Sequence, residues 1–310
     1  MLVALAGGVG AAKFLRGLLR VHHPDDLVVI GNTGDDLRMH GLAVSPDLDS
    51  VAYTLAGVAD EERGWGLAGE TWNVRDALVR LGEPGWFALG DRDIATHLLR
   101  TRLLAEGASL SEATAEVCRR LRVPVRLLPM SDQRVETRVE VDTADGPLDL
   151  GFQEYWVGRQ ARDPVRRVRF QGVEAARPTP GVLEALERAS GVVVCPSNPV
   201  VSIAPILAVP GIRAAVAAAP GRVVAVTPIV GGAPVRGMAD KLLPAWGAEV
   251  SARGVAGLYA GLADAFVLDA VDADQAADVA RLGLEPVVVP TLMRTVEDAA
   301  ALAKAALEAL

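Results

Sequence analysis

A glycine-rich turn near the start of the chain is the first candidate for chemistry. An apolar run at residues 2–6 leads into Gly7-Gly8-Val9-Gly10-Ala11-Ala12-Lys13 and then into a helix-like stretch. Glycines between a strand and a helix let backbone N–H groups approach a phosphate, and the helix dipole favours negative charge there. The turn is not a Walker loop, and it is not a regular dinucleotide fingerprint because Lys13 replaces the third glycine. It indicates either an anion site or a merely tight turn.

Aspartates form the second group of candidates. They stand in pairs after apolar runs, at Asp35 and Asp36, Asp47 and Asp49, and Asp91 and Asp93. Two carboxylates about 4 Å apart repel by about 4 kcal/mol at an effective dielectric near 20, so a convergent set needs a divalent cation, a shared proton or basic partners. Magnesium binds through one or two carboxylates together with phosphate oxygens and water. For any single aspartate a helix cap is the favoured interpretation, but the set as a whole favours a site.

Two later turns offer further polar groups. Pro-Ser-Asn-Pro presents Ser197 and Asn198, and a second turn presents the backbone of Gly231 and Gly232. Hydroxyl, amide and backbone donors of this kind bind a base or a phosphate, although rigid turns are also common without a ligand. The four histidines show no zinc-ligand spacing and no GxSxG elbow occurs, which disfavours zinc and serine hydrolases. We interpret His97 as a helix residue near the site rather than a general base.

The elements that must position these groups alternate along the chain. Continuous apolar runs, typical of strands covered on both faces, occupy residues 2–6, 27–30, 86–89, 192–195, 223–226, 265–268 and 287–289. Helical patterns lie between them, for example at residues 14–20, 94–104, 183–189 and 296–310. This alternation predicts an α/β, Rossmann-like, doubly wound and mainly parallel sheet, in which ligands bind at the carboxyl ends of the strands near a topological switch point. The polar segments described above nearly all fall at such strand ends.

One region breaks the alternation. The segment RVETRVEVDTADGPLDLGF alternates apolar and polar residues around a Thr-Ala-Asp-Gly turn, which predicts an antiparallel hairpin. We therefore expect a Rossmann-like catalytic domain at residues 1–122 and 178–310 and an inserted β-rich subdomain at residues 123–177. The arginines at positions 159, 162, 166, 167 and 169 could meet an anionic ligand, but a solvated face is the favoured interpretation.

Composition limits the partners. The 310 residues are 51% hydrophobic and 23% charged, and the formal net charge of −8 argues against nucleic-acid and anionic-membrane binding. Residues 189–212 carry no charge, but four prolines divide this stretch into pieces too short to span a bilayer. Only two cysteines are present, which excludes a disulfide framework. We expect a cytoplasmic protein.

Taken together, the motifs resemble the 2-phospho-L-lactate transferase (CofD) family of deazaflavin-coenzyme (F420) biosynthesis. The matching stretches, in family order, are LAGGVGAAKFLRGL, NTGDDL, SPDLDSVAYTLAG, LGDRDIATHLLR, LPMSD, PSNPVVSIAPIL, TPIVGGAPVRGMADKL and PTLM. They extend over almost the whole chain. One mild departure is the MADK segment, where the family pattern has a proline.

The resemblance implies a transfer reaction with magnesium as the cofactor. A guanosine-diphosphate-linked donor, lactyl or enolpyruvyl diphosphoguanosine, passes its phospholactyl or phosphoenolpyruvyl group to the ribityl hydroxyl of 7,8-didemethyl-8-hydroxy-5-deazariboflavin. GMP is released. The resemblance also implies a Rossmann-like fold with a smaller insertion, and a homodimer. The sequence leaves the choice between the lactyl and the enolpyruvyl donor open.

The resemblance and the residues together suggest a role for each candidate. We expect the Gly7, Gly8 and Gly10 turn and Lys13 to hold the diphosphate, with the guanosine reaching Ser197, Asn198, Gly231 and Gly232. Asp49 would bind the acceptor hydroxyl and magnesium and accept the proton, Asp36 is a second metal candidate, and Asp91 and Arg92 would contact the deazaflavin. On this hypothesis, Asp49→Asn abolishes transfer while hardly changing the melting temperature.

Two other classes of protein share parts of the pattern. A non-enzymatic, YvcK-like sugar-nucleotide-binding regulator has the glycine turn but is expected to lack SPDLDS and GDRD. An NAD-type oxidoreductase would need a third glycine at position 13 and a ribose-binding acid directly at the end of the second strand. Here Gly31-Asn32-Thr33 intervenes.

Overall fold

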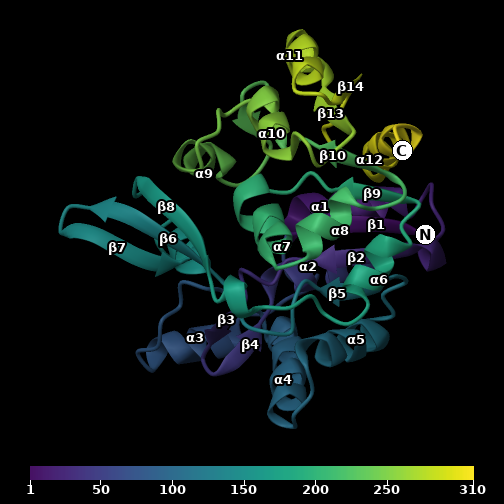
Figure 1. Ribbon diagram of the computed structural model, residues 1–310. Helices are drawn as coiled ribbons and strands as arrows, with labels where there is room; N and C mark the ends of the chain where they lie inside the picture. Colours follow the sequence, from purple (N-terminus) through teal and green to yellow (C-terminus); the bar gives the residue numbers. More distant parts are fainter.

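A seven-stranded, all-parallel sheet forms the centre of the computed structural model, which describes all 310 residues (Figure 1). The strands follow the spatial order β14 (Glu285–Val289), β13 (Ala265–Asp269), β10 (Arg222–Val226), β9 (Gly191–Val194), β1 (Leu2–Ala6), β2 (Leu27–Gly31) and β5 (Arg126–Pro129). The chain runs outward from β1 to β2 and β5, and then from β9 outward through β10 to β14. The switch in direction therefore lies between β1 and β9. The expected doubly wound fold is confirmed.

Helices cover both faces of this sheet. Side chains of β1 alternate between two cores: Val3 and Leu5 face one, and Leu2, Ala4 and Ala6 face the other. The second core is closed by α1 (Gly8–Leu18), α2 (Pro46–Leu55) and α12 (Val296–Glu308). The first is closed by α6 (Val182–Glu187), α7 (Ala204–Ala208), α8 (Ile212–Ala217), α9 (Ala239–Ala245), α10 (Ala252–Tyr259) and α11 (Ala276–Arg281). Burial on both faces explains why the strands have continuous apolar sequences.

A further helical group stands beyond the β5 edge of the sheet. It consists of α3 (Asn73–Arg80), α4 (Asp91–Ala105) and α5 (Leu110–Leu121), with the short hairpin of β3 (Leu37–Met39) and β4 (Leu42–Val44) beside α4. Residues 86–89, which we expected to be a strand, form an irregular loop before α4. The run is short, and only its Leu89 is buried, in a small cluster with Met39 and Val44.

The inserted element is a separate antiparallel sheet. Strands β6 (Glu136–Thr143), β7 (Gly146–Gly151) and β8 (Val165–Gln171) pair in the order β7-β6-β8, which confirms the predicted hairpin. The expected boundary at residue 123 assigned β5 to the insert, whereas β5 pairs in parallel with β2 in the main sheet. Arg166 and Arg169 pair with acidic residues of the same small sheet, as expected of a solvated face.

The remaining elements are short. They are the hairpin of β11 (Ile229–Val230) and β12 (Ala233–Pro234), 3-10 segments at Pro24–Asp26, Val173–Ala175 and Ala270–Gln275, and π-helical turns at Glu154–Gly158 and Pro199–Ile203. None of the helices combines the length and apolar character that a membrane span requires.

Candidate functional site

A cleft with a cavity volume of about 670 Å³ opens at the carboxyl ends of the strands, where the turns after β1 and β9 meet. This is the switch point of the sheet, the position at which doubly wound folds bind ligands. The size falls within the range of about 300–1,000 Å³ that is usual for small-molecule sites. The candidate residues from the sequence that line the cleft include Gly7, Gly8, Gly10, Lys13, Asp49, Ser197 and Asn198.

The glycine turn is held tightly against the turn after β9. The Gly7 N–H donates to Ser197 Oγ at 3.3 Å, and a Cβ built on Gly10 would lie 2.4 Å from the carbonyl oxygen of Pro196. Helix α1 begins here without a side-chain cap, so its first N–H groups are free to bind a ligand. Lys13 lines the cleft and makes no ion pair within 4.0 Å. The turn therefore presents donors that suit an anion, next to an unpaired cation.

Two carboxylates, Asp35 and Asp47, face this turn from the β2 side. A Cβ on Gly7 would lie 2.6 Å from Asp47 Oδ2, which accepts a hydrogen bond of 2.8 Å from Asn32. Gln153 donates to Asp35 Oδ2 at 3.2 Å, but Asp35 Oδ1 is buried without a partner. Burial raises the pKa of Asp47 to about 6, and burial together with the Asp47 charge raises the pKa of Asp35 well above its usual value.

This pair suits a divalent cation. The two buried acids repel each other, and one of their oxygens lacks any donor, so a cation would relieve both costs. No group of three or more acidic, histidine or cysteine side chains is arranged to hold an ion. A pair of carboxylates is nevertheless compatible with Mg²⁺, which takes one or two carboxylates and completes its shell with phosphate oxygens and water.

The two aspartates expected to bind the metal are engaged elsewhere. Asp49 forms a bidentate ion pair with Arg100, through Nη1 to Oδ2 at 3.0 Å and through Nη2 to Oδ1. Asp36 accepts from the Ser45 hydroxyl at 2.8 Å through Oδ2. Its Oδ1 is buried without a partner, as in Asp35, but Asp36 does not line the cleft. Burial raises the pKa of Asp36 to about 8 despite the Ser45 hydrogen bond. The geometry favours Asp35 and Asp47 over Asp36 and Asp49.

Two other candidates from the sequence, Asp91 and Arg92, lie off the cleft for identifiable reasons. Asp91 caps α3, because it accepts from the Val74 N–H at 3.0 Å and from Asn73. The hydrogen bond from the Thr71 hydroxyl, followed by those from Val74 and Asn73, lowers the pKa of Asp91 to about 2. Arg92 is exposed and donates to the Ala68 carbonyl at 2.8 Å. Both residues thus fix the segment between α2 and α4 rather than line the cavity.

Gly231 and Gly232 likewise have a structural role. They form the two-residue turn of the β11–β12 hairpin, with φ values of +58° and +77°. Two successive positive φ angles define the turn type that favours glycine at both positions. The Gly231 N–H is already bonded to Asp272 at 2.9 Å. The cleft is lined instead by residues on either side of this hairpin, among them Pro228 and Arg236.

A buried polar network between α2 and α4 was not foreseen. It joins Asp49 and Tyr53 of α2 to Asp93, His97 and Arg100 of α4, and each of these residues is at most 8% exposed. Spacings of four residues in α2, and of four and three in α4, put these side chains on facing helix surfaces, which was the available signal in the sequence. All except Arg100 line the cleft.

An aromatic wall completes the cleft, and it too was missed. Trp65, Trp86 and Phe87 come from the irregular segments before α3 and α4, and Phe152 and Trp156 come from the insert. Trp86 and Phe87 pack edge to face with ring centroids 5.7 Å apart. Trp65, Trp86 and Phe87 lie on irregular segments, and Trp156 lies in the π-helical turn Glu154–Gly158, so no long periodic pattern predicts the wall. The wall offers a surface on which a flat ring system would stack.

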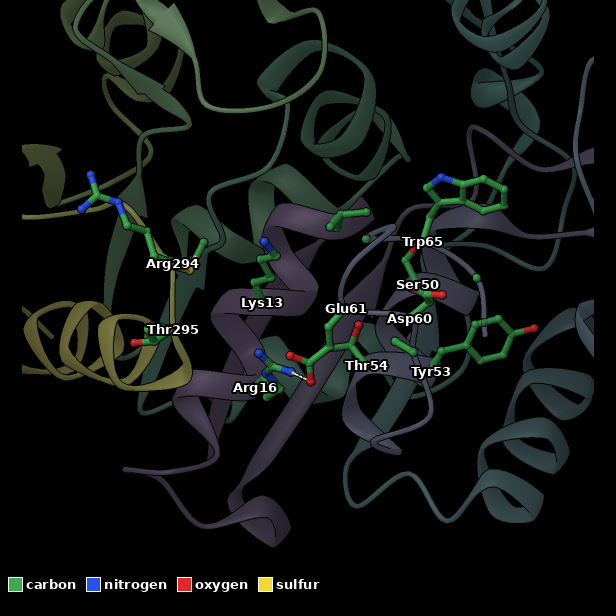
Figure 2. Close-up of a pocket in the computed structure, with 16 residues that line it drawn as sticks. Lys13, Arg16, Ser50, Tyr53, Thr54, Asp60, Glu61, Trp65, Arg294 and Thr295 are labelled. Carbon is green, nitrogen blue, oxygen red and sulfur yellow. Dashed lines mark hydrogen bonds and ion pairs between the residues drawn. The ribbon is translucent and has the colours of Figure 1, made fainter. Parts of the chain in front are cut away.

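A small side cavity of about 100 Å³ extends the cleft past Lys13 (Figure 2). It shares Lys13, Ser50, Tyr53 and Trp65 with the cleft. Figure 2 shows Lys13 between Arg294 and Trp65, with Arg16 paired to Glu61 below it. Of the cations that line this cavity, Arg16 is neutralised by Glu61, whereas Lys13 and Arg294 form no ion pair within 4.0 Å.

Comparison with known protein families shows the family of the chain. The family model described as 2-phospho-L-lactate transferase CofD matches residues 2–301. The chain belongs to the CofD family. The resemblance inferred from the motifs is therefore confirmed over nearly the whole chain.

Curated relatives of this CofD family member are named phosphoenolpyruvate transferases. The Kitasatospora aureofaciens protein is 52% identical over 309 residues, covering 99% of this chain and 96% of its own. The Thermobifida fusca protein is 50% identical over 317 residues, with 99% and 97% covered. The Mycolicibacterium smegmatis protein is 40% identical over 319 residues, with 99% and 98% covered. Neither the regulator nor the oxidoreductase interpretation is favoured by these relatives.

Solved structures share the fold of this CofD family member. The crystal structure of protein BH3568 from Bacillus halodurans has a TM-score of 0.63 at 18% identity and covers 99% of this chain and 98% of its own. A second crystal structure of that protein, described as a UPF0052 family member, has a TM-score of 0.62 at 16% identity. At such identities the likeness concerns the fold alone.

Proposed function

We propose that this protein transfers the phosphoenolpyruvyl group from enolpyruvyl diphosphoguanosine to the ribityl hydroxyl of 7,8-didemethyl-8-hydroxy-5-deazariboflavin, releasing GMP in F420 biosynthesis. Family membership supports a CofD-type transfer, and the names of relatives 50–52% identical favour the enolpyruvyl over the lactyl donor. The observation that carries the proposal is a single cleft. In it, an uncapped glycine turn and a pair of buried carboxylates face an aromatic wall.

The donor diphosphate would lie on the glycine turn. Its charge matches the free N–H groups at the start of α1 and the unpaired ammonium group of Lys13. The guanosine would extend past Ser197 and Asn198, which line the cleft beyond this turn. Gly231 and Gly232 are no longer part of the proposed contact, since their turn does not reach the cavity.

Asp35 and Asp47 would hold Mg²⁺ beside the diphosphate. Bound there, the ion would neutralise the charge that develops on the phosphate oxygens. Asp47 lies against the glycine turn, so the proposed ion and phosphate sites are adjacent. Asn32 and Gln153 orient the two carboxylates through their own hydrogen bonds.

The acceptor would stack its tricyclic ring on the aromatic wall. The ribityl chain would then point toward the polar surface of α2 and α4, where Asp49, Tyr53, Asp93 and His97 line the cavity. The acceptor oxygen bonds to the phosphorus that carries the enolpyruvyl group, the anhydride P–O bond breaks, and GMP departs with the electron pair. Chemistry of this kind depends chiefly on positioning and charge neutralisation.

The purified protein, Mg²⁺ and the deazaflavin are combined with each donor in turn to test this function. We expect the acceptor to gain the phosphoenolpyruvyl group and GMP to appear in equal amount, with the enolpyruvyl donor preferred over the lactyl donor. Mass spectrometry of the acceptor and quantification of GMP provide the measurement. Absence of transfer from either donor would refute the function, and a preference for the lactyl donor would refute the specificity.

Gly10→Ala tests the glycine turn. A Cβ 2.4 Å from the Pro196 carbonyl forces the turns after β1 and β9 apart, which should destabilise the protein by about 1–3 kcal/mol and raise the KM for the donor roughly tenfold. Gly257→Ala is the matched control. It lies in α10 with no atom within 4 Å of the added Cβ, so it should leave KM unchanged and stability equal or higher. Steady-state kinetics and thermal denaturation measure both effects, and equal KM values for the two variants would contradict the proposed diphosphate site.

We also propose, from family membership, that the protein is a homodimer. Light scattering during size-exclusion chromatography measures this directly.

A further inference from the structure

The buried network between α2 and α4 contains more charge than stability requires. Five ionisable side chains lie in a row between these helices, and His97 and Arg100 are only 1% exposed. Removing charges from water is costly, and a well-packed apolar contact in their place is often neutral or stabilising. The network therefore calls for a role beyond holding the two helices together.

Asp49 is poorly suited to receive a proton. Both of its oxygens contact the Arg100 guanidinium, so its charge is neutralised in place and neither oxygen is free. His97 is equally occupied. Its Nδ1 lies 3.3 Å from Arg100 Nη1, which is always a donor, so this nitrogen acts as the acceptor. Its Nε2 lies 3.2 Å from Asp93 Oδ1.

Asp93 is the member of the network with an available oxygen. Its Oδ1 accepts from the Tyr53 hydroxyl at 2.6 Å and faces His97 Nε2. Its Oδ2 has no hydrogen-bond partner in the protein and is not fully buried. Asp93 also lines the cleft and, at 8%, is the most exposed of the five. One carboxylate oxygen is thus held by the protein while the other faces the cavity.

We propose that Asp93 is the catalytic base that receives the proton of the acceptor hydroxyl, with Tyr53 and His97 as positioning residues. This inference rests on the proposed function. The hydroxyl donates a hydrogen bond to Asp93 Oδ2, and its proton passes to that oxygen as the new O–P bond forms. The anhydride P–O bond breaks in the same step, and its electron pair leaves with the GMP phosphate.

The electrostatic surroundings agree with an ionised base. Burial alone would raise the pKa of Asp93, but the His97 hydrogen bond, followed by the Tyr53 hydrogen bond and the Arg100 charge, holds it below the usual value. Asp49 is the remaining charged member of the network. Two charged groups outside it face the network: Asp36, near Arg100, and Glu70, whose Oε1 accepts from the Asp93 N–H at 2.8 Å. A carboxylate of low pKa that orients a hydroxyl is the arrangement by which protein kinases transfer phosphoryl groups.

The test compares Asp93→Asn with the wild type in the transfer assay. Asparagine keeps the shape and still accepts from Tyr53, but it does not take up a proton. We expect kcat to fall at least about a hundredfold with KM values within about threefold. Glu112→Gln is the matched control, because Glu112 occupies the same third helical position at the start of α5 and is exposed away from the cleft. It should retain wild-type turnover.

A second variant keeps the proposal testable if Asp93→Asn does not fold. Tyr53→Phe removes one hydrogen bond to Asp93, so the pKa of Asp93 should rise and the acid limb of the kcat–pH profile should move to higher pH. Because the pKa of Asp93 lies below the usual carboxyl value in the wild type, the rate near pH 4 should fall more than the rate at pH 8. An unchanged profile, or Asp93→Asn with near-wild-type kcat beside an active wild type, would overturn the assignment of the base. Absence of transfer by the wild type itself would instead overturn the proposed function.

Discussion

Asp47→Asn should lower the transfer rate by at least about a hundredfold while leaving the fold intact. The loss corresponds to about 2.7 kcal/mol of transition-state stabilisation at 1.36 kcal/mol per tenfold. Asparagine preserves the hydrogen bond from Asn32 but removes half of the charge proposed to hold Mg²⁺ next to the glycine turn. In the wild type, addition of Mg²⁺ should raise the melting temperature, and in the variant this rise should disappear.

The pH dependence of stability provides a readout of Asp47→Asn that does not involve activity. The folded-state pKa of Asp47 is raised to about 6, so its protonated form stabilises the metal-free protein at low pH, and this contribution is lost as the pH rises from about 4 through 6. The variant should lack this part of the decline. Asp36→Asn is the control, because Asp36 is a partly buried neighbour that accepts from Ser45 outside the cleft. This variant should leave the Mg²⁺-dependent rise in melting temperature in place. Loss of that rise in Asp36→Asn alone would show that the ion binds elsewhere.

Arg100→Met should cost about 3–5 kcal/mol of folding free energy, because it leaves the Asp49 carboxylate buried without its partner. With an unfolding entropy of about 2.1 cal/mol/K per residue, this corresponds to a fall of roughly 5–8 °C in melting temperature. Asp49→Asn should also lower the melting temperature, since it leaves the Arg100 guanidinium unpaired. The structure thus changes the expectation from the sequence that Asp49 could be neutralised without a thermal effect.

The double variant Asp49→Leu/Arg100→Met separates pairing from packing. If the cost of each single change comes from an unpaired buried charge, removal of both charges should restore more than half of the lost stability. Calorimetry of the wild type, the single variants Asp49→Leu and Arg100→Met, and the double variant measures the coupling free energy between the two side chains. A double variant as unstable as the sum of its single changes would show that the pair is not the cause.

Local patterns in the sequence determined much of the architecture and part of the site. Continuous apolar runs predict the buried strands, since both faces of the main sheet are covered by helices. Strict alternation around Thr143–Gly146 predicts the β6–β7 hairpin, which has one solvated face. The glycine turn after β1 also follows from the sequence, because strand, glycines and helix are contiguous there. At residues 86–89 the same logic failed, since a short apolar run resembles a strand even where its aromatic residues line a cleft.

Only the tertiary structure decided which aspartate performs which task. All six candidates stand in similar local contexts, and their partners come from distant segments: Arg100 lies 51 residues from Asp49, and Tyr53 lies 40 from Asp93. These two pairings exist only once α2 packs against α4. Residue spacing indicates which side chains share a helix face, but it does not predict which partner each side chain meets. Asp36 and Asp91 lie outside the cavity, and Asp49 lines it with both oxygens on Arg100. Asp35, Asp47 and Asp93 line the cavity without such an ion pair to an arginine. The spacing of residues along the chain determines secondary structure, whereas the chemistry open to a buried acid depends on which side chains surround it after folding.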